Sequence, residues 1–340
     1  MAVDLGTRVT KAVYLQRKGG GFALSNFIMR DAPVYDRSLT ADKLSDHLKD
    51  IVHDLGAKTR SVSLILGAGE SLVRTAEMPL IPTFQMIQML KVNSKNYLQQ
   101  DLKDHKFDCH IQMQPDTGGE EDGDGPKGMA KAKVVVGGGK SETVEIVREA
   151  ARLAGLHVDE ITTGLVQPAN AFEQALPEVF EKEVVALVDF GYKNSAITIL
   201  MLGELCLNRV VGFGAAKLTA GIAETLGITN AEAEGIKIGM PQEVESTIQP
   251  LLTPLGRELR ASIDFFEHQH DTTVSQVFFS GGSACSDYII QALQSELMVP
   301  CKSWNPADFL ALDLPPEQMG TVEQVAPQLT VAVGAAAMII

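Results

Sequence analysis

The chain has few of the residues that mark disulfide-bonded, membrane-spanning or nucleic-acid-binding proteins. Its only cysteines, Cys109, Cys206, Cys285 and Cys301, form no Cys-x-x-Cys pair, so free thiols are expected rather than a zinc site or a disulfide framework. The longest apolar run, residues 331–340, is about half of what a membrane-spanning helix needs. Acidic residues outnumber basic ones, and the net charge of −14 argues against a broad nucleic-acid surface.

What remains is the composition of an ordinary globular protein. With 340 residues, 45% hydrophobic and 21% charged, the chain is long enough for about two domains, each with its own core. No signal peptide follows Met1. We therefore expect a cytoplasmic protein that does not itself insert into a membrane.

The two halves of the chain repeat one order of predicted elements. Alternating or β-branched runs predict strands at residues 2–5, 9–15, 22–29 and 61–66, with a helix over 44–55 before the last strand. The second half repeats this order with strands at 184–189, 195–201 and 205–211 and a helix over 214–226. Each half places Asp-x-Gly at the end of its first strand, which indicates an internal duplication.

Further elements are predicted between and after these repeats. A small inserted subdomain is predicted from strands at 74–78, 107–113 and 132–136, helices over 83–101 and 141–154, and a mobile solvated loop at 115–128. The second half continues with helices over 231–239, 244–268 and 287–297, strands at 274–280 and 301–304, and a closing helix over 329–340.

The turn after the first strand has the residues expected of a phosphate site. Gly6 leaves room for backbone amides to point at one anion, and the Thr7 hydroxyl can add a donor. Asp4 can hold Mg²⁺ or its water ligands, and Lys11 adds a positive charge one strand later. By itself this hairpin is a weak signal, because Asp-x-Gly also occurs in ordinary turns.

Two later turns strengthen this interpretation. Asp189 and Gly191 occupy the matching place in the second half, and a third tight turn runs from Gly281 through Gly282 to Ser283, between a strand and a helix. A Mg-nucleotide held between two lobes needs acidic and glycine-rich turns from both. The three turns together predict a nucleotide clamp.

In these three motifs the chain resembles the actin/Hsp70/sugar-kinase superfamily, and within it the branch of FtsA and PilM. Residues 2–13 and 185–197 are similar to the first and second phosphate motifs, 277–284 to the adenosine motif, and 164–171 and 231–237 to the first connecting helix and the helix bordering the adenosine. The resemblance implies an α/β, actin/Hsp70-like (ribonuclease H-like) fold of duplicated domains with a small inserted subdomain of the FtsA/PilM type.

It also implies a division into four parts. Residues 1–73, 155–183 and 322–340 form the first lobe, 74–154 the inserted subdomain, 184–213 with 270–321 the second lobe, and 214–269 a helical subdomain. The segments at 74–82 and 256–266 resemble the PilM family in particular. We also expect no basic amphipathic membrane-targeting tail of the FtsA kind.

The resemblance carries roles to individual residues. ATP is expected to contact a set of turn and helix residues: Gly6, Thr7, Lys11, Gly191, Tyr192, Lys193, Asn194, Gly214, Glu234, Lys237, Gly281, Gly282 and Ser283. Asp4 and Asp189 are expected to hold Mg²⁺ through water, and Gln167 to position an attacking water. The family has small residues where this chain has Tyr192, Lys193 and Asn194. Their bulk can crowd a γ-phosphate or Lys193 can neutralise it.

The expected function is that of an ATP-binding scaffold, at most a weak ATPase, in a type IV pilus or secretion assembly. The resemblance implies a partner, the N-terminal cytoplasmic peptide of a bitopic PilN-like inner-membrane protein, which binds a groove of the small subdomain and keeps the scaffold peripheral to that membrane. Self-association is compatible with it. Two alternatives stay open: an FtsA-like filament-forming division protein, and a small-molecule kinase of the same superfamily.

Several other motifs have simpler explanations. The run that ends in Gly139, Lys140 and Ser141 lacks the upstream glycine of a phosphate-binding P-loop and is interpreted as a glycine-rich turn with Ser141 as helix cap. His268 and His270 have no third metal ligand at a useful spacing. Glu234 and Lys237, three residues apart on a helix, also fit a surface ion pair.

Overall fold

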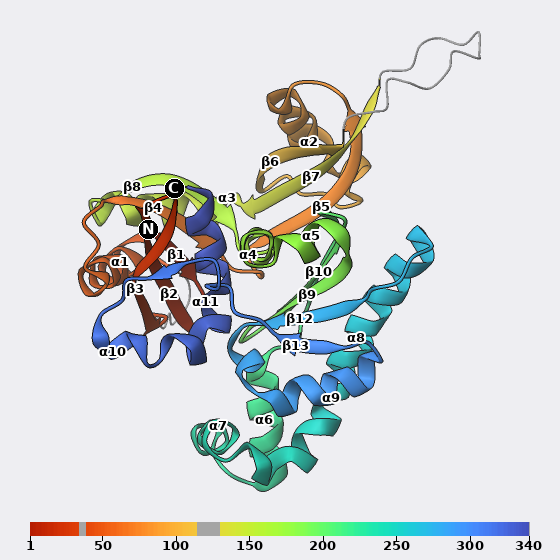
Figure 1. Cartoon of the computed structure of the whole chain (residues 1–340). Coiled ribbons are helices and arrows are strands. Elements are labelled where there is room, and N and C mark those ends of the chain that lie inside the picture. Colours follow the sequence, from red (N-terminus) through yellow and green to blue (C-terminus); the bar gives the residue numbers. More distant parts are fainter. Residues whose placement is uncertain (34–38, 114–129, 340) are drawn as a thin grey trace.

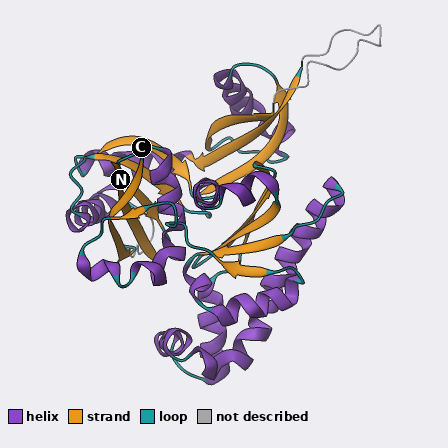
Figure 2. Cartoon of the chain, in the orientation of Figure 1, coloured by secondary structure: helices purple, strands orange, loops and turns teal. Residues whose placement is uncertain are grey.

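The structure, a computed structural model, describes residues 1–33, 39–113 and 130–339. Two lobes are built around two separate sheets, and a small three-stranded unit projects beside them (Figure 1). Helices surround the two larger sheets (Figure 2). The loop predicted at residues 115–128 lies outside the described residues.

The first lobe contains a six-stranded sheet in the order β14-β3-β2-β1-β4-β8. Its strands are β1 (Ala2–Leu5), β2 (Val9–Lys18), β3 (Gly21–Asp31), β4 (Ser61–Leu66), β8 (His157–Thr163) and β14 (Ala311–Leu312). β1, β2 and β3 form an antiparallel meander, whereas β4 runs parallel to both β1 and β8. Helices α1 (Ala41–Leu55) and α3 (Ser141–Leu153) bury their apolar faces on one side, and α11 (Val322–Met338) packs on the other.

The second lobe contains a five-stranded sheet in the order β11-β10-β9-β12-β13. Its strands are β9 (Val184–Phe190), β10 (Ser195–Met201), β11 (Glu204–Val211), β12 (Gln276–Ser280) and β13 (Cys301–Ser303). One face is covered by α6 (Ala215–Leu226), α7 (Asn230–Gly239), the 3₁₀ turn η1 (Pro241–Val244), α8 (Glu245–His270) and α9 (Asp287–Leu297). The other face turns towards α4 (Gln167–Ala175) and α5 (Pro177–Lys182).

The two sheets share one topology, which confirms the predicted duplication. In each, an antiparallel meander of three strands is extended by parallel strands on the side of its first strand. The lobes differ in where additional elements are inserted. The first lobe has them between β4 and β8, and the second has its helices α6 to α8 between β11 and β12.

The insertion of the first lobe is the small subdomain. Its sheet has the order β5-β7-β6, from strands β5 (Ser71–Pro79), β6 (His105–Met113) and β7 (Lys131–Lys140), and helix α2 (Thr83–Leu98) packs against it. Across the described ranges, no helix is both long and apolar enough to span a membrane.

The glycine-rich turn predicted before Ser141 is wrong. Gly137, Gly138 and Gly139 lie within β7, the central strand, and pair with β5 and β6 on both sides. A Cβ atom at Gly139 would lie 2.9 Å from Leu66 Cδ1, so packing rather than turn formation requires the glycine. The cap of α3 is the residue at position 140, without a side-chain hydrogen bond, and Ser141 is already inside the helix.

Strand β8 was not predicted, and the reason is a β-bulge. Val62 pairs with Val158 but Ser63 pairs with Glu160, which places one extra residue in β8. The apolar residues Val158 and Ile161 are three positions apart in the sequence. The two-residue alternation of apolar residues that predicts a strand is therefore missing.

The C-terminal region also differs from the prediction. Helix α11 begins at Val322, seven residues before the predicted start at 329, and the short α10 (Pro316–Met319) precedes it. The strand β14 (residues 311–312) pairs with β3 of the first lobe. The prediction has the chain return to the first lobe only at position 322. The four-part division of the chain stays a prediction.

Helices α4 and α11 lie against each other beside the first sheet. At their crossing, a Cβ atom on Gly334 would lie 2.1 Å from the backbone oxygen of Gln167. The two helix backbones therefore meet without an intervening side chain. The same helix α11 accepts a hydrogen bond from the Gly281 amide at the Pro327 carbonyl, over 2.7 Å, which ties it to the second lobe.

This contact can be tested by replacing glycine with alanine. Gly334→Ala is expected to lower the free energy of unfolding by about 3 kcal/mol, because the two backbones must separate. Gly235→Ala in α7, where nothing lies within 4 Å of the new Cβ atom, is the matched control. It should be neutral or raise stability by about 1 kcal/mol. Urea unfolding measures both, and equal effects would contradict the packing described for α11.

Candidate functional site

A cavity of about 750 Å³ lies between the two lobes, where the turns after β1, β9 and β12 meet. This is within the range of about 300–1,000 Å³ that is usual for small-molecule sites. Most of the predicted site residues line it: Asp4, Gly6, Thr7, Lys11, Asp189, Gly191, Tyr192, Lys193, Asn194, Glu234, Lys237, Gly281, Gly282 and Ser283. Residues that are far apart in the chain therefore form one wall.

Three glycines allow the turns to close up. A Cβ atom at Gly6 would lie 2.3 Å from the Val9 oxygen, and one at Gly191 would lie 2.7 Å from the Asn194 oxygen. Gly281, with φ of 89°, has a conformation that side-chain-bearing residues rarely adopt, and its Cβ atom would lie 2.5 Å from the Phe190 oxygen. The turn after β12 therefore rests directly on the turn after β9.

The centre of the cavity holds two carboxylates and one lysine. Lys11 Nζ donates to Asp4 Oδ2 over 2.9 Å, with both side chains largely buried. Burial lowers the pKa of Lys11, but the neighbouring charge of Asp4, its hydrogen bond and the charge of Asp189 outweigh this and raise that pKa. Lys11 therefore stays protonated.

Asp189 has the opposite balance. Burial raises its pKa, and the attraction of Lys11 does not cancel this because the charge of Asp4 adds to it. The hydrogen bond from Ser280 Oγ to Asp189 Oδ1 is long, at 3.5 Å. A second cation at this point would relieve the excess negative charge, and carboxylate oxygens suit Mg²⁺.

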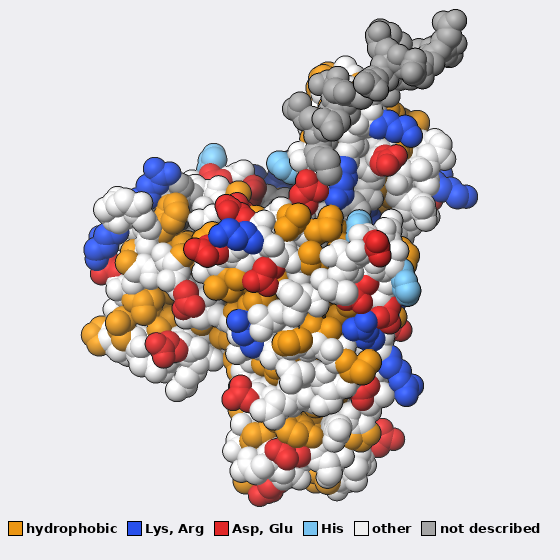
Figure 3. Space-filling view, turned by 45° about the vertical axis from the view of Figure 1, so that its right-hand side comes forward, with side chains coloured by type: hydrophobic (Ala, Val, Ile, Leu, Met, Phe, Trp, Pro, Cys, Tyr) orange, Lys and Arg blue, Asp and Glu red, His pale blue; other side chains and the backbone are white. Residues whose placement is uncertain are grey.

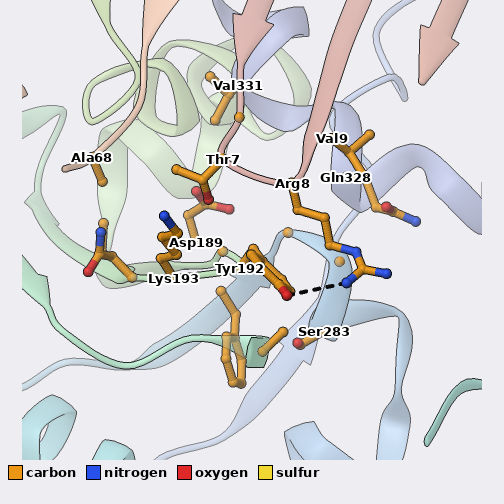
Figure 4. Close-up of a pocket in the computed structure, with 18 of the residues that line it drawn as sticks. Thr7, Arg8, Val9, Ala68, Asp189, Tyr192, Lys193, Ser283, Gln328 and Val331 are labelled. Carbon is orange, nitrogen blue, oxygen red and sulfur yellow. Dashed lines mark hydrogen bonds between the residues drawn. The ribbon is translucent and has the colours of Figure 1, made fainter. Parts of the chain in front are cut away.

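In Figure 4, Thr7 from the turn after β1 lies above Asp189 of β9 and Lys193 of the turn that follows β9. The Lys193 side chain is directed towards Thr7 and Asp189, whereas the Tyr192 ring is turned to the side, towards Arg8. The bulk of Tyr192 is thus directed away from Lys193.

Glu234 and Lys237 lie on α7 at the cavity wall and form an ion pair with each other. Lys237 Nζ donates to Glu234 Oε2 over 2.7 Å and to Thr219 Oγ1 over 2.9 Å. Burial raises the pKa of Glu234, but hydrogen bonds from Lys237 and Thr219 more than offset it and the pKa is lowered. The sequence left two alternatives for Glu234 and Lys237, an ion pair or a position beside the nucleotide. In the structure the two residues form the ion pair and also line the cavity.

Two predicted site residues do not line the cavity. The Gln167 side chain is buried, and its amide nitrogen donates to the Thr163 carbonyl over 3.1 Å while its oxygen accepts from Asn170 over 2.9 Å. Its amide is thus engaged in the α4 region rather than directed at the cavity. Gly214 lies behind the turn, where a Cβ atom would be 2.4 Å from the Tyr192 oxygen.

The sequence missed several residues of the wall. They come from a fourth turn after β4, from the hairpin after β1, from the end of β3, from the segment after β12 and from α11: Arg8, Asp31, Gly67, Ala68, Gly69, Cys285, Asp287, Tyr288 and Gln328. The fourth turn had a usable signal. β4 is parallel to β1, so its carboxyl end opens at the same edge of the sheet, and Gly67 and Gly69 follow that strand directly.

Histidine and cysteine form no additional site in the part of the chain that is described. No group of three or more His, Cys, Asp or Glu side chains there is arranged to hold a metal ion. The ring of His270 packs on that of Phe266, with centroids 4.5 Å apart. The cysteines are free thiols, as predicted.

Comparison with known families agrees with this arrangement. The profile of the family described as type IV pilus assembly protein PilM matches residues 2–338. The chain belongs to the PilM family. The predicted actin-like fold is confirmed, since structures of a PilM-PilN complex, of EutJ and of MreB5 match 99% of the chain.

Solved structures show the same fold. A PilM-PilN type IV pilus biogenesis complex matches with a TM-score of 0.83 at 20% identity, over 99% of this chain and 97% of that chain. The ethanolamine utilization protein EutJ from Carboxydothermus hydrogenoformans matches with 0.56 at 14% identity, over 99% and 88%. MreB5 of Spiroplasma citri bound to ADP matches with 0.53 at 10% identity, over 99% and 95%.

The raised pKa of Asp189 leads to a prediction without any ligand. The pKa of Asp189 is higher in the folded state than in the unfolded state. The contribution of Asp189 to the free energy of unfolding therefore falls as the pH rises from below its unfolded-state pKa to above its folded-state pKa. Asp189→Asn removes the charge. The variant is expected to melt above the wild type at pH 7.5, with the difference shrinking towards pH 4. A variant that melts below the wild type at pH 7.5 would contradict this balance.

Proposed function

We propose that this PilM-family protein is an ATP-binding scaffold of a type IV pilus or related secretion assembly. The observation that carries the proposal is the cavity itself, in which three glycine-dependent turns from both lobes surround Asp4, Lys11 and Asp189. Membership of the PilM family supports the cellular context. The match to a structure of MreB5 with bound ADP supports a nucleotide as the ligand.

The residues present fit a Mg-nucleotide. Backbone amides around Gly6 and Gly191 can hold phosphates. Both positions need glycine, because a Cβ atom there would collide with the backbone of the turn. Lys11 and Lys193 supply positive charge from opposite lobes, and Asp4 with Asp189 supplies carboxylates for Mg²⁺. A metal held by these carboxylates would neutralise phosphate charge. Glu234 and Lys237 are at the wall proposed for the ribose and adenine.

Binding rather than rapid turnover is the proposed role. Phosphoryl transfer depends on a water placed in line with the γ-phosphate, and the residue predicted for that task, Gln167, is engaged by Thr163 and Asn170 instead. Nucleotide would then hold the two lobes in one arrangement and so set the shape of the scaffold.

A thermal-shift measurement tests the nucleotide site. Mg-ATP at about a hundred times its Kd is expected to stabilise the wild type by about 2.7 kcal/mol. Asp189→Asn should lose most of the Mg²⁺-dependent part of the rise in Tm. Asp46→Asn, the same change at an exposed carboxylate of α1, should keep it. An undiminished rise in Asp189→Asn would place the metal elsewhere.

The partner in this proposal is the N-terminal cytoplasmic peptide of a PilN-like inner-membrane protein, as in the PilM-PilN complex to which the chain is similar. The small subdomain offers it apolar contacts, since Phe84 and Val92 of α2 are 63% and 83% exposed. The partner then keeps the scaffold at the cytoplasmic face of the inner membrane. On the face shown in Figure 3, basic side chains are scattered among acidic ones and form no continuous basic surface.

Calorimetric titration with that peptide tests the partner. The wild type should bind it, and Phe84→Ser should weaken binding about tenfold, a loss of roughly 1.4 kcal/mol. Met298→Ser removes a large apolar side chain of the second lobe that is 80% exposed and should bind normally. No heat with the wild type would rule out the partner, whereas normal binding by Phe84→Ser would move the peptide away from α2.

A further inference from the structure

Arg8 and Tyr192 contact each other across the cavity. Arg8 Nη1 donates to the Tyr192 hydroxyl over 3.3 Å, and the guanidinium carbon lies 5.0 Å from the centre of the tyrosine ring. Figure 4 shows this hydrogen bond on the side of the cavity that also carries Ser283 and Gln328. Arg8 belongs to the turn after β1 and Tyr192 to the turn after β9, so the contact joins the two lobes.

Both residues are held by their own lobe. The Tyr192 carbonyl accepts from the Ala216 amide of α6 over 2.9 Å, and Gly214 packs directly behind it. The Arg8 carbonyl accepts from the Ala32 amide over 2.7 Å, at the end of β3. Neither backbone can follow the other if the lobes move apart. The side-chain contact is therefore the part that gives way.

A phosphate would compete with Tyr192 for Arg8. The turn that carries Arg8 also carries Gly6 and Thr7, and all three residues line the cavity in which the phosphates are proposed to bind. An arginine binds phosphate through two charge-assisted hydrogen bonds, whereas Tyr192 offers one neutral oxygen at 3.3 Å. The Tyr192 hydrogen bond, followed by the charges of Glu234 and Asp31, raises the pKa of Arg8 against the effect of burial. Arg8 is charged and available.

We propose that Arg8 and Tyr192 form a latch between the lobes, which nucleotide phosphate opens by taking Arg8 away from Tyr192. The proposal rests on the nucleotide-binding function proposed above and adds a phosphate-binding residue and a means of regulation to that site. The Arg8–Tyr192 contact joins the two turns directly. With nucleotide bound, they are joined through its phosphates instead.

Equilibrium binding of ADP, ATP and adenosine to the full chain tests the latch. Tyr192→Phe keeps the ring but frees Arg8, so it should bind ADP about threefold more tightly, a small gain because the pair is partly exposed to solvent. Arg8→Gln should bind ADP and ATP about tenfold more weakly and adenosine as the wild type does. Tyr14→Phe removes a hydroxyl that accepts from Gln16 on β2, outside the cavity, and should change nothing.

The double variant separates a latch from a general effect on folding. Because Tyr192 acts through Arg8, Tyr192→Phe should bring no gain in the Arg8→Gln background. A gain that persists there, or a Tyr192→Phe protein that binds ADP like the wild type, overturns the latch alone. A wild type that binds neither ADP nor ATP overturns the proposed function as well.

Discussion

The close approach of α11 to α4 is the contact on which the cavity depends. Gly334 lets the two helix backbones touch at Gln167, and α11 also packs on the first sheet. The Pro327 carbonyl of α11 then holds the Gly281 amide of the second lobe. One helix thus positions the turn after β12 relative to the turn after β1. A side chain at Gly334 would move all of them.

The chemistry of the cavity follows from an imbalance between the negative and positive charges of its buried side chains. Asp4 is neutralised by Lys11 at 2.9 Å, but the burial of Asp189 is not fully compensated. A site built in this way favours a ligand that brings both a cation and an anion. In the proposed complex, a metal would offset the excess carboxylate charge, and phosphates would meet the turn amides and the lysines of both lobes. A direct contact between Arg8 and Tyr192 joins the turns of the two lobes beside these groups.

Predictions from the sequence succeeded where the determinants are local. Helix α1 ends at Gly56, which adopts the left-handed conformation that a glycine after a helix predicts. The Asp-x-Gly turns lie where the strand patterns end, because Gly6 and Gly191 are required by contacts within their own hairpins. Predictions failed where contacts with residues far away in the chain decide the local structure. Gly139 is in a strand because it pairs with Ser71 and Lys106, and the bulge in β8 is seen in its pairing with β4.

The same division applies to the site. The sequence by itself determined which turns have the glycines expected of a phosphate site and which of their residues are acidic or basic, since turn conformation and side-chain chemistry depend on a few consecutive residues. Only the tertiary structure decided that Gln167 is engaged by Thr163 and Asn170, and that Arg8 meets Tyr192, 184 residues later in the chain. Such contacts depend on how the two sheets and their helices pack against each other, and no short run of residues encodes that arrangement.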